Sequence, residues 1–304
     1  MMLFKRSMHS VTKSRYIVAA FVMVLSLVTP VSSTLLSNTA NAATMTLAGK
    51  TIKEVQTGFD TACAVADGWA YCWGANDRGQ LGNGTTNTSA NAIPTAVSSS
   101  TTGKPAGPAV CIAYFWIFCT AYGPGTPAVP PSAMAGLEVE QVSVGETHAC
   151  AIANARVYCW GDNDRGQLGN GSTVAYSSVP VKVDVSGVLA NKEIIDVSAG
   201  ESFTCALTSD GKVACWGAGD YGRLGNKSED DTSTPKLIDM GQGSALEGKK
   251  GIKLARAAMA TTCVLAVSSA AFADGPDKGN PYCWGVGIGN GTIPGPGRIT
   301  VACN

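Results

Sequence analysis

Short segments with the residue pattern of β-strands, broken by turn residues, recur along the chain after about residue 43. Three of these segments end in a glycine, Gly58, Gly145 or Gly200, that stands five positions before a cysteine. The cysteine opens a second segment, which a turn joins to a third segment ending in Cys-Trp-Gly. Short strands joined by tight turns are typical of all-β proteins. The pattern therefore predicts an all-β fold.

The first of these units, CAVADGWAYC from Cys63 to Cys72, predicts a hairpin closed by its own cysteines. Asp67-Gly68 is a strong signal for a two-residue type I′ turn. Counting outward from that turn, Cys63 lies opposite Cys72 at a non-hydrogen-bonded pair. The Cα atoms of such a pair are about 4.5 Å apart, which is within reach of a disulfide.

Three later units preserve this register. One has the same length, one has a three-residue loop ending in Gly211, where a turn with a bulge requires glycine, and one has a longer loop. The alternative, a zinc site, is disfavoured because the only histidines are His9 and His148. No metal site and no cofactor are predicted. The predicted disulfides are Cys63–Cys72, Cys150–Cys159, Cys205–Cys215 and Cys263–Cys283, with Cys303 left over.

A fourteen-residue phrase follows the same units: YCWGANDRGQLGNG begins at Tyr71 and returns at Tyr158 as YCWGDNDRGQLGNG. The third copy has Arg223 in place of the glutamine, and the fourth is shortened. The phrase resembles the repeat of the regulator of chromosome condensation family, including its bacterial alpha-tubulin suppressor-like members. The resemblance implies a β-propeller, often seven-bladed, made of four-stranded blades. The chain length fits about four to five blades, so a smaller ring, an incomplete ring and two chains that complete one ring stay open as alternatives.

The residues that recur in every copy are expected to be structural. The tryptophan of each copy should pack between blades, and the glycines should permit a tight turn. The acidic residues Asp162 and Asp164 should cap their own turn rather than bind calcium, since the first copy has Ala75 in the leading place. The phrase is no phosphate loop, because no Gly-Lys-Ser/Thr follows it. The recurring tryptophans are Trp73, Trp160, Trp216 and Trp284.

The N-terminal segment has the features of a secretory signal peptide. Four basic residues precede an apolar run of about thirteen residues from Tyr16 to Val28, and small residues ending in Ala40-Asn41-Ala42 follow. An uncleaved membrane anchor is the alternative, although the run falls short of the ~20 residues that a spanning helix needs. We expect a signal peptide at residues 1–42 and repeats over residues 43–304. Export together with eleven cysteines predicts disulfides and a secreted or cell-surface protein.

Charge and composition argue against two function classes. Basic and acidic residues balance at 22 each, and four basic residues lie before Ala43, which leaves the remainder slightly acidic. Nucleic-acid binding relies on a basic field, so it is not expected. His148 is the one histidine after the predicted signal peptide, and no Ser/His/Asp motif or carboxylate pair accompanies it. No catalytic residue is predicted, and the protein is not expected to be an enzyme.

Function is expected in the largest departure from the repeat, an insertion at about residues 85–135. It contains CIAYFWIFC, in which Cys111 and Cys119 are expected to close a small ring around aromatic residues. A stapled aromatic loop suits a preorganised anchor for a partner. Covering an open blade face and forming a fifth blade are the alternatives. The candidate partner-binding residues are Tyr114, Phe115, Trp116 and Phe118.

These observations together predict an exported, non-catalytic propeller scaffold that binds an unidentified protein partner through loops. Secreted β-lactamase inhibitors with the same type of repeat are similar to it in this respect. The alternative is guanine-nucleotide exchange on a small GTPase, the activity of the nuclear family member, and a glycan-active propeller enzyme is a weaker third. A homodimer through Cys303 is an alternative to a monomer, and a membrane is a partner only if the N-terminal segment stays uncleaved.

Overall fold

The computed structural model describes residues 47–99, 111–115, 118–122, 131–255, 261–269, 279–285 and 297–298. The chain divides into two compact units, Met1–Ala48 and Gly49–Asn304. All the described strands belong to the second unit. The predicted signal peptide, Trp116 and Cys303 lie outside the described residues.

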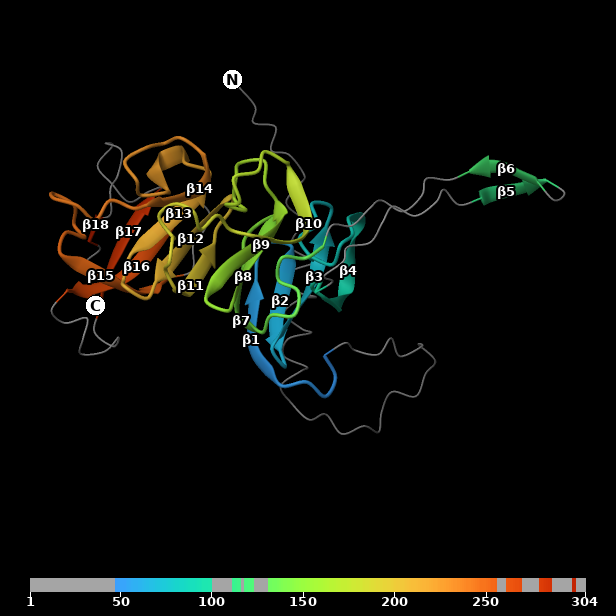
Figure 1. Ribbon diagram of the computed structural model, residues 1–304, viewed down its shortest axis with the longest axis horizontal. Helices are drawn as coiled ribbons and strands as arrows, with labels where there is room; N and C mark the ends of the chain where they lie inside the picture. The colour runs from blue at the N-terminus through green and yellow to red at the C-terminus, as the bar shows by residue number, and fades with distance from the viewer. Residues whose placement is uncertain are drawn as a thin grey trace, which may run out of the picture. The chain divides into compact units, whose positions relative to one another are not determined.

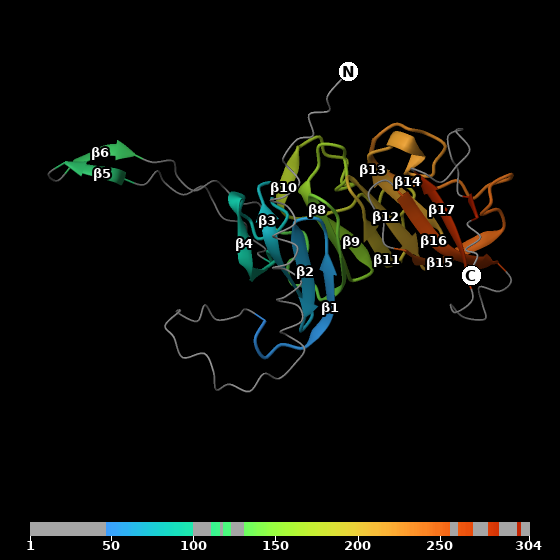
Figure 2. The ribbon, with the colours of Figure 1, turned by 180° about the vertical axis from the view of Figure 1, so that it is seen from behind.

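Four antiparallel four-stranded sheets, called blades 1 to 4 here, make up most of the second unit (Figures 1 and 2). Blade 1 contains β1 (Ile52–Thr57), β2 (Thr61–Ala66), β3 (Trp69–Asn76) and β4 (Asn87–Ala96). Blade 2 contains β7 (Val139–Val144), β8 (His148–Ala153), β9 (Arg156–Asp162) and β10 (Tyr176–Lys182). Blade 3 contains β11 (Ile194–Ala199), β12 (Phe203–Thr208), β13 (Val213–Gly217) and β14 (Thr232–Leu237), with a short 3-10 turn, η1 (Asp220–Gly222), after β13. Blade 4 contains β15 (Lys249–Leu254), β16 (Thr261–Ser268), β17 (Asn280–Gly285) and β18 (Gly297–Arg298). A separate two-stranded sheet pairs β5 (Cys111–Phe115) with β6 (Phe118–Tyr122).

Each blade is built around a central hairpin whose two strands are joined by a disulfide. In blade 1 the turn has positive φ at Asp67 (50°) and at Gly68 (77°), as a type I′ turn requires. The bridged cysteines lie directly opposite each other in the strand register. Their Cα atoms are 4.0 or 4.1 Å apart. The bridged pairs, which are the ones that the hairpin spacing predicts, are Cys63–Cys72, Cys150–Cys159, Cys205–Cys215 and Cys263–Cys283.

The apolar core lies between consecutive blades, because successive strand residues point to opposite faces of a sheet. The face of each blade that carries the disulfide, called the disulfide face, packs against the next blade along the chain. The face that carries the recurring tryptophan, called the tryptophan face, packs against the preceding blade. The core between blades 1 and 2 includes Cys63, Val65, Cys72, Ala151 and Trp160. The tryptophans in the three cores are fully buried, as expected: Trp160, Trp216 and Trp284.

The outer strand of blade 1 comes from a segment expected to be inserted. Residues Asn87–Ala96 form β4, which pairs with β3 and is mostly exposed. Its Asn, Ser and Thr content is that of a loop, but the backbone bonds to β3 hold it extended. Because it pairs with β3, the polar strand β4 is the fourth strand of blade 1 and belongs to the repeat unit.

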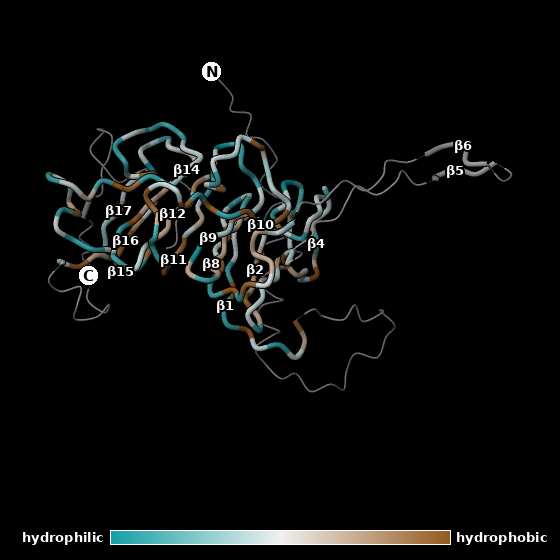
Figure 3. Tube along the Cα trace, in the orientation of Figure 1, coloured by the Kyte–Doolittle hydropathy of each residue, from teal (hydrophilic) through white to brown (hydrophobic). Residues whose placement is uncertain are grey.

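Hydrophilic residues also fill the loops, such as the one before β14, where the tube in Figure 3 is largely teal.

Candidate functional site

The innermost strands of the four blades, β1, β7, β11 and β15, lie side by side in chain order. Each pairs with the second strand of its own blade through a register shift, which lies near the start of β1, β7 and β11 and past the middle of β15. A bulge of this kind re-aims the side chains that follow it. The residues that follow the four shifts are Glu54, Gln141, Asp196 and Lys253.

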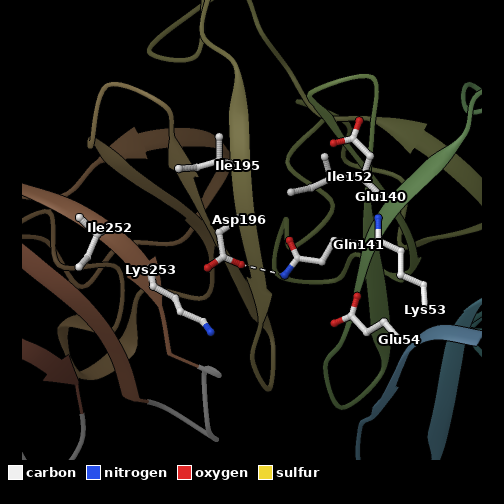
Figure 4. Close-up of a pocket in the computed structure, with 9 residues that line it drawn as sticks. All are labelled: Lys53, Glu54, Glu140, Gln141, Ile152, Ile195, Asp196, Ile252 and Lys253. Atoms are coloured by element: carbon white, nitrogen blue, oxygen red, sulfur yellow. Dashed lines mark hydrogen bonds between the residues drawn. The ribbon is translucent and has the colours of Figure 1, made fainter. Parts of the chain in front are cut away.

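Three of these side chains form a ladder of hydrogen bonds from blade to blade. Each accepts from a backbone N–H of the innermost strand in the next blade. The bonds run from Val142 N to Glu54 Oε2 (3.3 Å), from Val197 N to Gln141 Oε1 (3.2 Å) and from Leu254 N to Asp196 Oδ2 (2.8 Å). In addition, Gln141 Nε2 donates to Asp196 Oδ1 at 2.8 Å, as Figure 4 shows. The ladder satisfies buried N–H groups that no strand pairs with.

A shallow groove runs over these strands, with a volume of about 480 Å³. Burial raises the pKa of the Asp196 carboxyl, although the hydrogen bonds from Gln141 and Leu254 oppose that rise. Glu54 and Asp196 each accept a backbone hydrogen bond, so part of the acceptor capacity of these two carboxylates is used to join neighbouring blades. Its lining residues are Lys53, Glu54, Glu140, Gln141, Ile152, Ile195, Asp196, Ile252 and Lys253 (Figure 4).

The four residues that follow the register shifts, including the three that form the ladder, were not predicted as site residues from the sequence. A signal exists in the sequence, since Glu54, Gln141 and Asp196 each stand nine positions before the first cysteine of their hairpin. In blade 4 the matching residue, Lys253, stands ten positions before Cys263. The signal is hard to interpret without the structure, because the bonds of these residues reach a different blade.

His148 lies at the contact between blades 2 and 3. Its side chain is almost fully buried, and its Nε2 lies 2.9 Å from Thr204 Oγ1. Burial lowers the pKa of His148 to about 3, so the ring is neutral at ordinary pH. The other ring nitrogen, Nδ1, is buried without a hydrogen-bond partner. The arrangement is that of a packed inter-blade residue.

The repeated Asn-Asp-Arg-Gly-Gln-Leu-Gly phrase makes a turn and ties that turn to the next blade. Asn76 Oδ1 accepts from the N–H of Leu81 (3.1 Å), and the second copy repeats this bond. Arg78 reaches forward to Asp162 and Asp164 in blade 2, at 3.6 and 3.3 Å. Burial, and next the charge of Asp164, raise the pKa of Asp162. In the same way, Arg165 pairs with Asp220 and Asp231 of blade 3.

The predicted aromatic anchor lies on the separate β5–β6 hairpin. The backbone register places Phe115 opposite Phe118, Tyr114 opposite Cys119, and Cys111 opposite Tyr122. The side chains of this hairpin lie outside the described part of the structure, as does Trp116. The Cys111–Cys119 bond and the role of the aromatic residues therefore stay predictions.

Two further features of the described residues bear on the kind of site. No helix among them is both long enough and apolar enough to cross a membrane. Within the same ranges, no three His, Cys, Asp or Glu side chains are grouped so that they could hold a metal ion.

Known proteins share the repeat and the fold. The mouse (Mus musculus) E3 ubiquitin-protein ligase HERC2 is 33% identical over 219 residues, which are 62% of this chain and 4% of the ligase. The ultraviolet-B receptor UVR8 of Arabidopsis thaliana is 35% identical over 111 residues, which are 36% of this chain and 24% of the receptor. The chain thus spans a small part of the curated relatives it matches.

Two solved structures have a similar fold. Human WBSCR16 aligns with a TM-score of 0.59 and 20% identity, over 84% of this chain and 54% of that one. Yeast RCC1 (Prp20), solved with Kap60 bound to it, aligns with a TM-score of 0.53 and 18% identity, over 84% of this chain and 50% of that one. This chain covers about half the length of each.

The repeat described as "Regulator of chromosome condensation (RCC1) repeat" matches residues 67–111, 154–207 and 210–266, which together are just over half of the chain. A second form of the same repeat matches residues 139–167 and 194–223. The matched segments include the disulfide hairpins of blades 2 and 3, the Gly-Gln-Leu-Gly turns of blades 1 and 2, and the corresponding Gly-Arg-Leu-Gly turn of blade 3. With its four four-stranded antiparallel blades, the chain belongs to the regulator of chromosome condensation repeat family and has that family's β-propeller type of fold.

Proposed function

We propose that the protein is an exported, non-catalytic propeller scaffold that binds a protein partner through its loops. The observation that carries this proposal is the β5–β6 hairpin, which belongs to none of the four blades. It is inserted between blades 1 and 2 and carries the aromatic residues Tyr114, Phe115 and Phe118. Function on a repeat scaffold usually resides in such departures from the repeat.

The polar residues of the blades support a scaffold rather than an enzyme. Glu54 and Asp196 hold neighbouring strands together, and His148 is neutral and packed between blades. Catalytic groups need freedom to exchange protons with a substrate. Binding to proteins occurs on the same fold, since the yeast protein Prp20p was described with its binding to Gsp1p and histones.

Two features of the chain, its N-terminal segment and its disulfides, support export. The first 42 residues have the pattern of a signal peptide, and four disulfides join the hairpins. Disulfides form and persist in oxidising compartments. The proposed location is therefore outside the cytoplasm, secreted or on the cell surface, with repeats over residues 43–304. Guanine-nucleotide exchange, which acts on cytoplasmic or nuclear GTPases, fits this location poorly.

The test is affinity capture from the extracellular fraction by the full exported chain and by a variant of the hairpin. The variant carries Tyr114→Ser, Phe115→Ser and Phe118→Ser, and the captured proteins are quantified by mass spectrometry. A control variant carries Trp69→Ser and Tyr176→Ser, which remove aromatic surface that is 42% and 44% exposed elsewhere on the blades. We expect the hairpin variant to lose a partner that the control keeps, and a purified partner to bind the wild type at least tenfold more tightly than the hairpin variant.

Equal capture by both variants would place the partner site elsewhere. An unprocessed N-terminus in a cytoplasmic fraction would contradict export. Turnover of a glycan, or accelerated release of GDP from a small GTPase, would favour the enzyme or the exchange factor over the scaffold.

A further inference from the structure

The end of the repeated phrase carries the sequence motif for N-linked glycosylation. In each of the four copies, an asparagine near the end of the phrase is followed, after one residue, by threonine or serine. Asn-X-Ser/Thr, with X other than proline, is the acceptor motif for N-linked glycans on the surface of exported proteins. The four matches are Asn83-Gly84-Thr85, Asn170-Gly171-Ser172, Asn226-Lys227-Ser228 and Asn290-Gly291-Thr292, and the last of them lies outside the described residues.

The three described asparagines lie in the same kind of turn. Each turn belongs to the loop between the third and the fourth strand of its blade. The side-chain Oδ1 of each asparagine accepts a hydrogen bond from the backbone N–H of the hydroxyl residue two positions later. The three bonds run from Thr85 N to Asn83 Oδ1 (3.0 Å), from Ser172 N to Asn170 Oδ1 (3.1 Å) and from Ser228 N to Asn226 Oδ1 (3.1 Å).

The amide nitrogen of these side chains is accessible. Within the described part of the structure, Nδ2 of Asn83, Asn170 and Asn226 donates no hydrogen bond, and each residue is partly exposed. The asparagine earlier in the phrase differs, because Asn76 and Asn163 are only 1% and 4% exposed and donate from Nδ2 to backbone carbonyls. One recurring asparagine is therefore buried and hydrogen-bonded, while the other presents a free amide nitrogen.

The turn itself does not require a hydroxyl residue. The bond to Oδ1 comes from a backbone N–H, which every residue except proline has. The hydroxyl groups make different contacts: Thr85 Oγ1 donates to Asn83 Oδ1 at 2.6 Å, whereas Ser172 Oγ accepts from Val174 N at 3.0 Å. No single contact within the turn explains why a hydroxyl recurs in every copy. The acceptor motif explains it, because the motif requires threonine or serine at this position.

We propose that the protein carries N-linked glycans on the asparagines of these turns. Nδ2 of Asn170, for example, forms a bond to C1 of the first sugar of a lipid-diphosphate-linked oligosaccharide. The bond between that C1 and the diphosphate oxygen breaks, the diphosphate leaves with the lipid, and Nδ2 loses one proton. The inference rests on the proposed export, because the motif is used in secreted proteins. A further match, Asn87-Thr88-Ser89, lies at the start of β4, outside the repeated turn, and is not part of the proposal.

The test is mass spectrometry of the full exported chain isolated from its natural source. After proteolysis, we expect the peptides that contain Asn170 and Asn226 to carry sugar on the asparagine side chain. Asn154 is an exposed asparagine in the β8–β9 turn, but Arg156 stands where the motif needs a hydroxyl, so Asn154 should be unmodified. An exported chain without sugar on Asn83, Asn170 or Asn226 would overturn this proposal and leave export intact. A chain retained in the cytoplasm would contradict export and this proposal with it.

A pair of variants at one position separates the motif from the turn. Ser172→Ala keeps the backbone N–H that bonds to Asn170 but removes the hydroxyl, so the intact mass should fall by one glycan. Ser172→Thr keeps a hydroxyl at the same place and should keep the glycan. A glycan on Asn170 in Ser172→Ala, or its absence in Ser172→Thr, would overturn the proposal. Neither variant alters the β5–β6 hairpin, so partner binding can be measured separately.

Discussion

At the scale of single residues, the recurring tryptophans differ in how much their indole N–H contributes to the stability of the fold. Trp160 Nε1 donates to Gln80 O at 2.8 Å, whereas Gln167 O accepts from both Trp216 Nε1 and Thr204 Oγ1. Trp160→Phe therefore leaves a buried carbonyl without this donor and should cost about 1–3 kcal/mol beyond the packing loss. Trp216→Phe should cost less, because Thr204 still serves the carbonyl. Urea unfolding of both variants measures the difference, and equal losses would contradict this account.

His148 predicts a loss of stability in acid. Its pKa is about 3 in the folded protein, against 6.5 for an unperturbed histidine. Between these values the unfolded chain binds a proton that the folded chain excludes, so stability is full above about pH 6.5 and falls as the pH drops toward 3. The limiting slope is about 1.4 kcal/mol per pH unit. His148→Phe, which copies Phe203 at the matching position of blade 3, should flatten the profile of unfolding free energy between pH 6 and 4. Parallel profiles for wild type and variant would contradict the assignment.

The partner of a residue that acts inside one hairpin could be predicted from the sequence. For residues that act between blades, the sequence predicted that the tryptophans pack there, but it did not predict the hydrogen-bond partners of any of these residues. The Cys63–Cys72 bond follows from counting outward from Asp67-Gly68, and the structure has that register. Glu54 bonds to Val142, which is far away in the sequence, so its partner depends on how blades pack. The spacing of residues along the chain gives the register within a hairpin, but it does not give the contacts between blades.

At the scale of elements, the Gly-Gln-Leu-Gly turn is shaped by its contact with the next tryptophan. Gly82 has a φ of +63°, and a Cβ placed on it would lie 2.8 Å from Trp160 Cδ1. Gly136 has a similar φ of +73°, but a Cβ there would meet nothing within 4 Å. Gly136→Ala should cost about 1–2 kcal/mol for the left-handed backbone alone. Gly82→Ala should cost about 1–3 kcal/mol more from overpacking. Thermal and urea unfolding measure the loss of stability in each variant. Similar losses for the two variants would show that the Trp160 ring can move aside to make room for the added methyl group.

Some of the strands could also be predicted from the sequence, and others could not. The central hairpins carry strong turn signals, and they were predicted with their register. β4 was not predicted, because its Asn, Ser and Thr residues resemble a loop and nothing in its own pattern shows that β3 provides its hydrogen bonds. The β5–β6 hairpin was expected only as one of several alternatives, and it forms a sheet of its own.

At the scale of the whole molecule, each blade depends on its neighbours. The cores, the ladder on the innermost strands and the tryptophan hydrogen bonds all join consecutive blades. Stability in such an array is approximately a sum of unit and nearest-neighbour terms. The first and last blades lack one neighbour each among the described strands, which explains why the unsatisfied Trp73 N–H and the open face at Cys263 occur there.

A covalent pair of chains through Cys303 is expected from the sequence, because the other predicted disulfides join cysteines within one hairpin or loop. Four of those hairpin bridges are present in the structure, and Cys303 lies outside the described residues. We expect the wild type to have the mass of two chains in light scattering under oxidising conditions and Cys303→Ser to have the mass of one chain. Chemical reduction is the poorer test, since it also opens the hairpin disulfides. A mass of two chains for Cys303→Ser, or of one chain for the wild type, would contradict a link through Cys303.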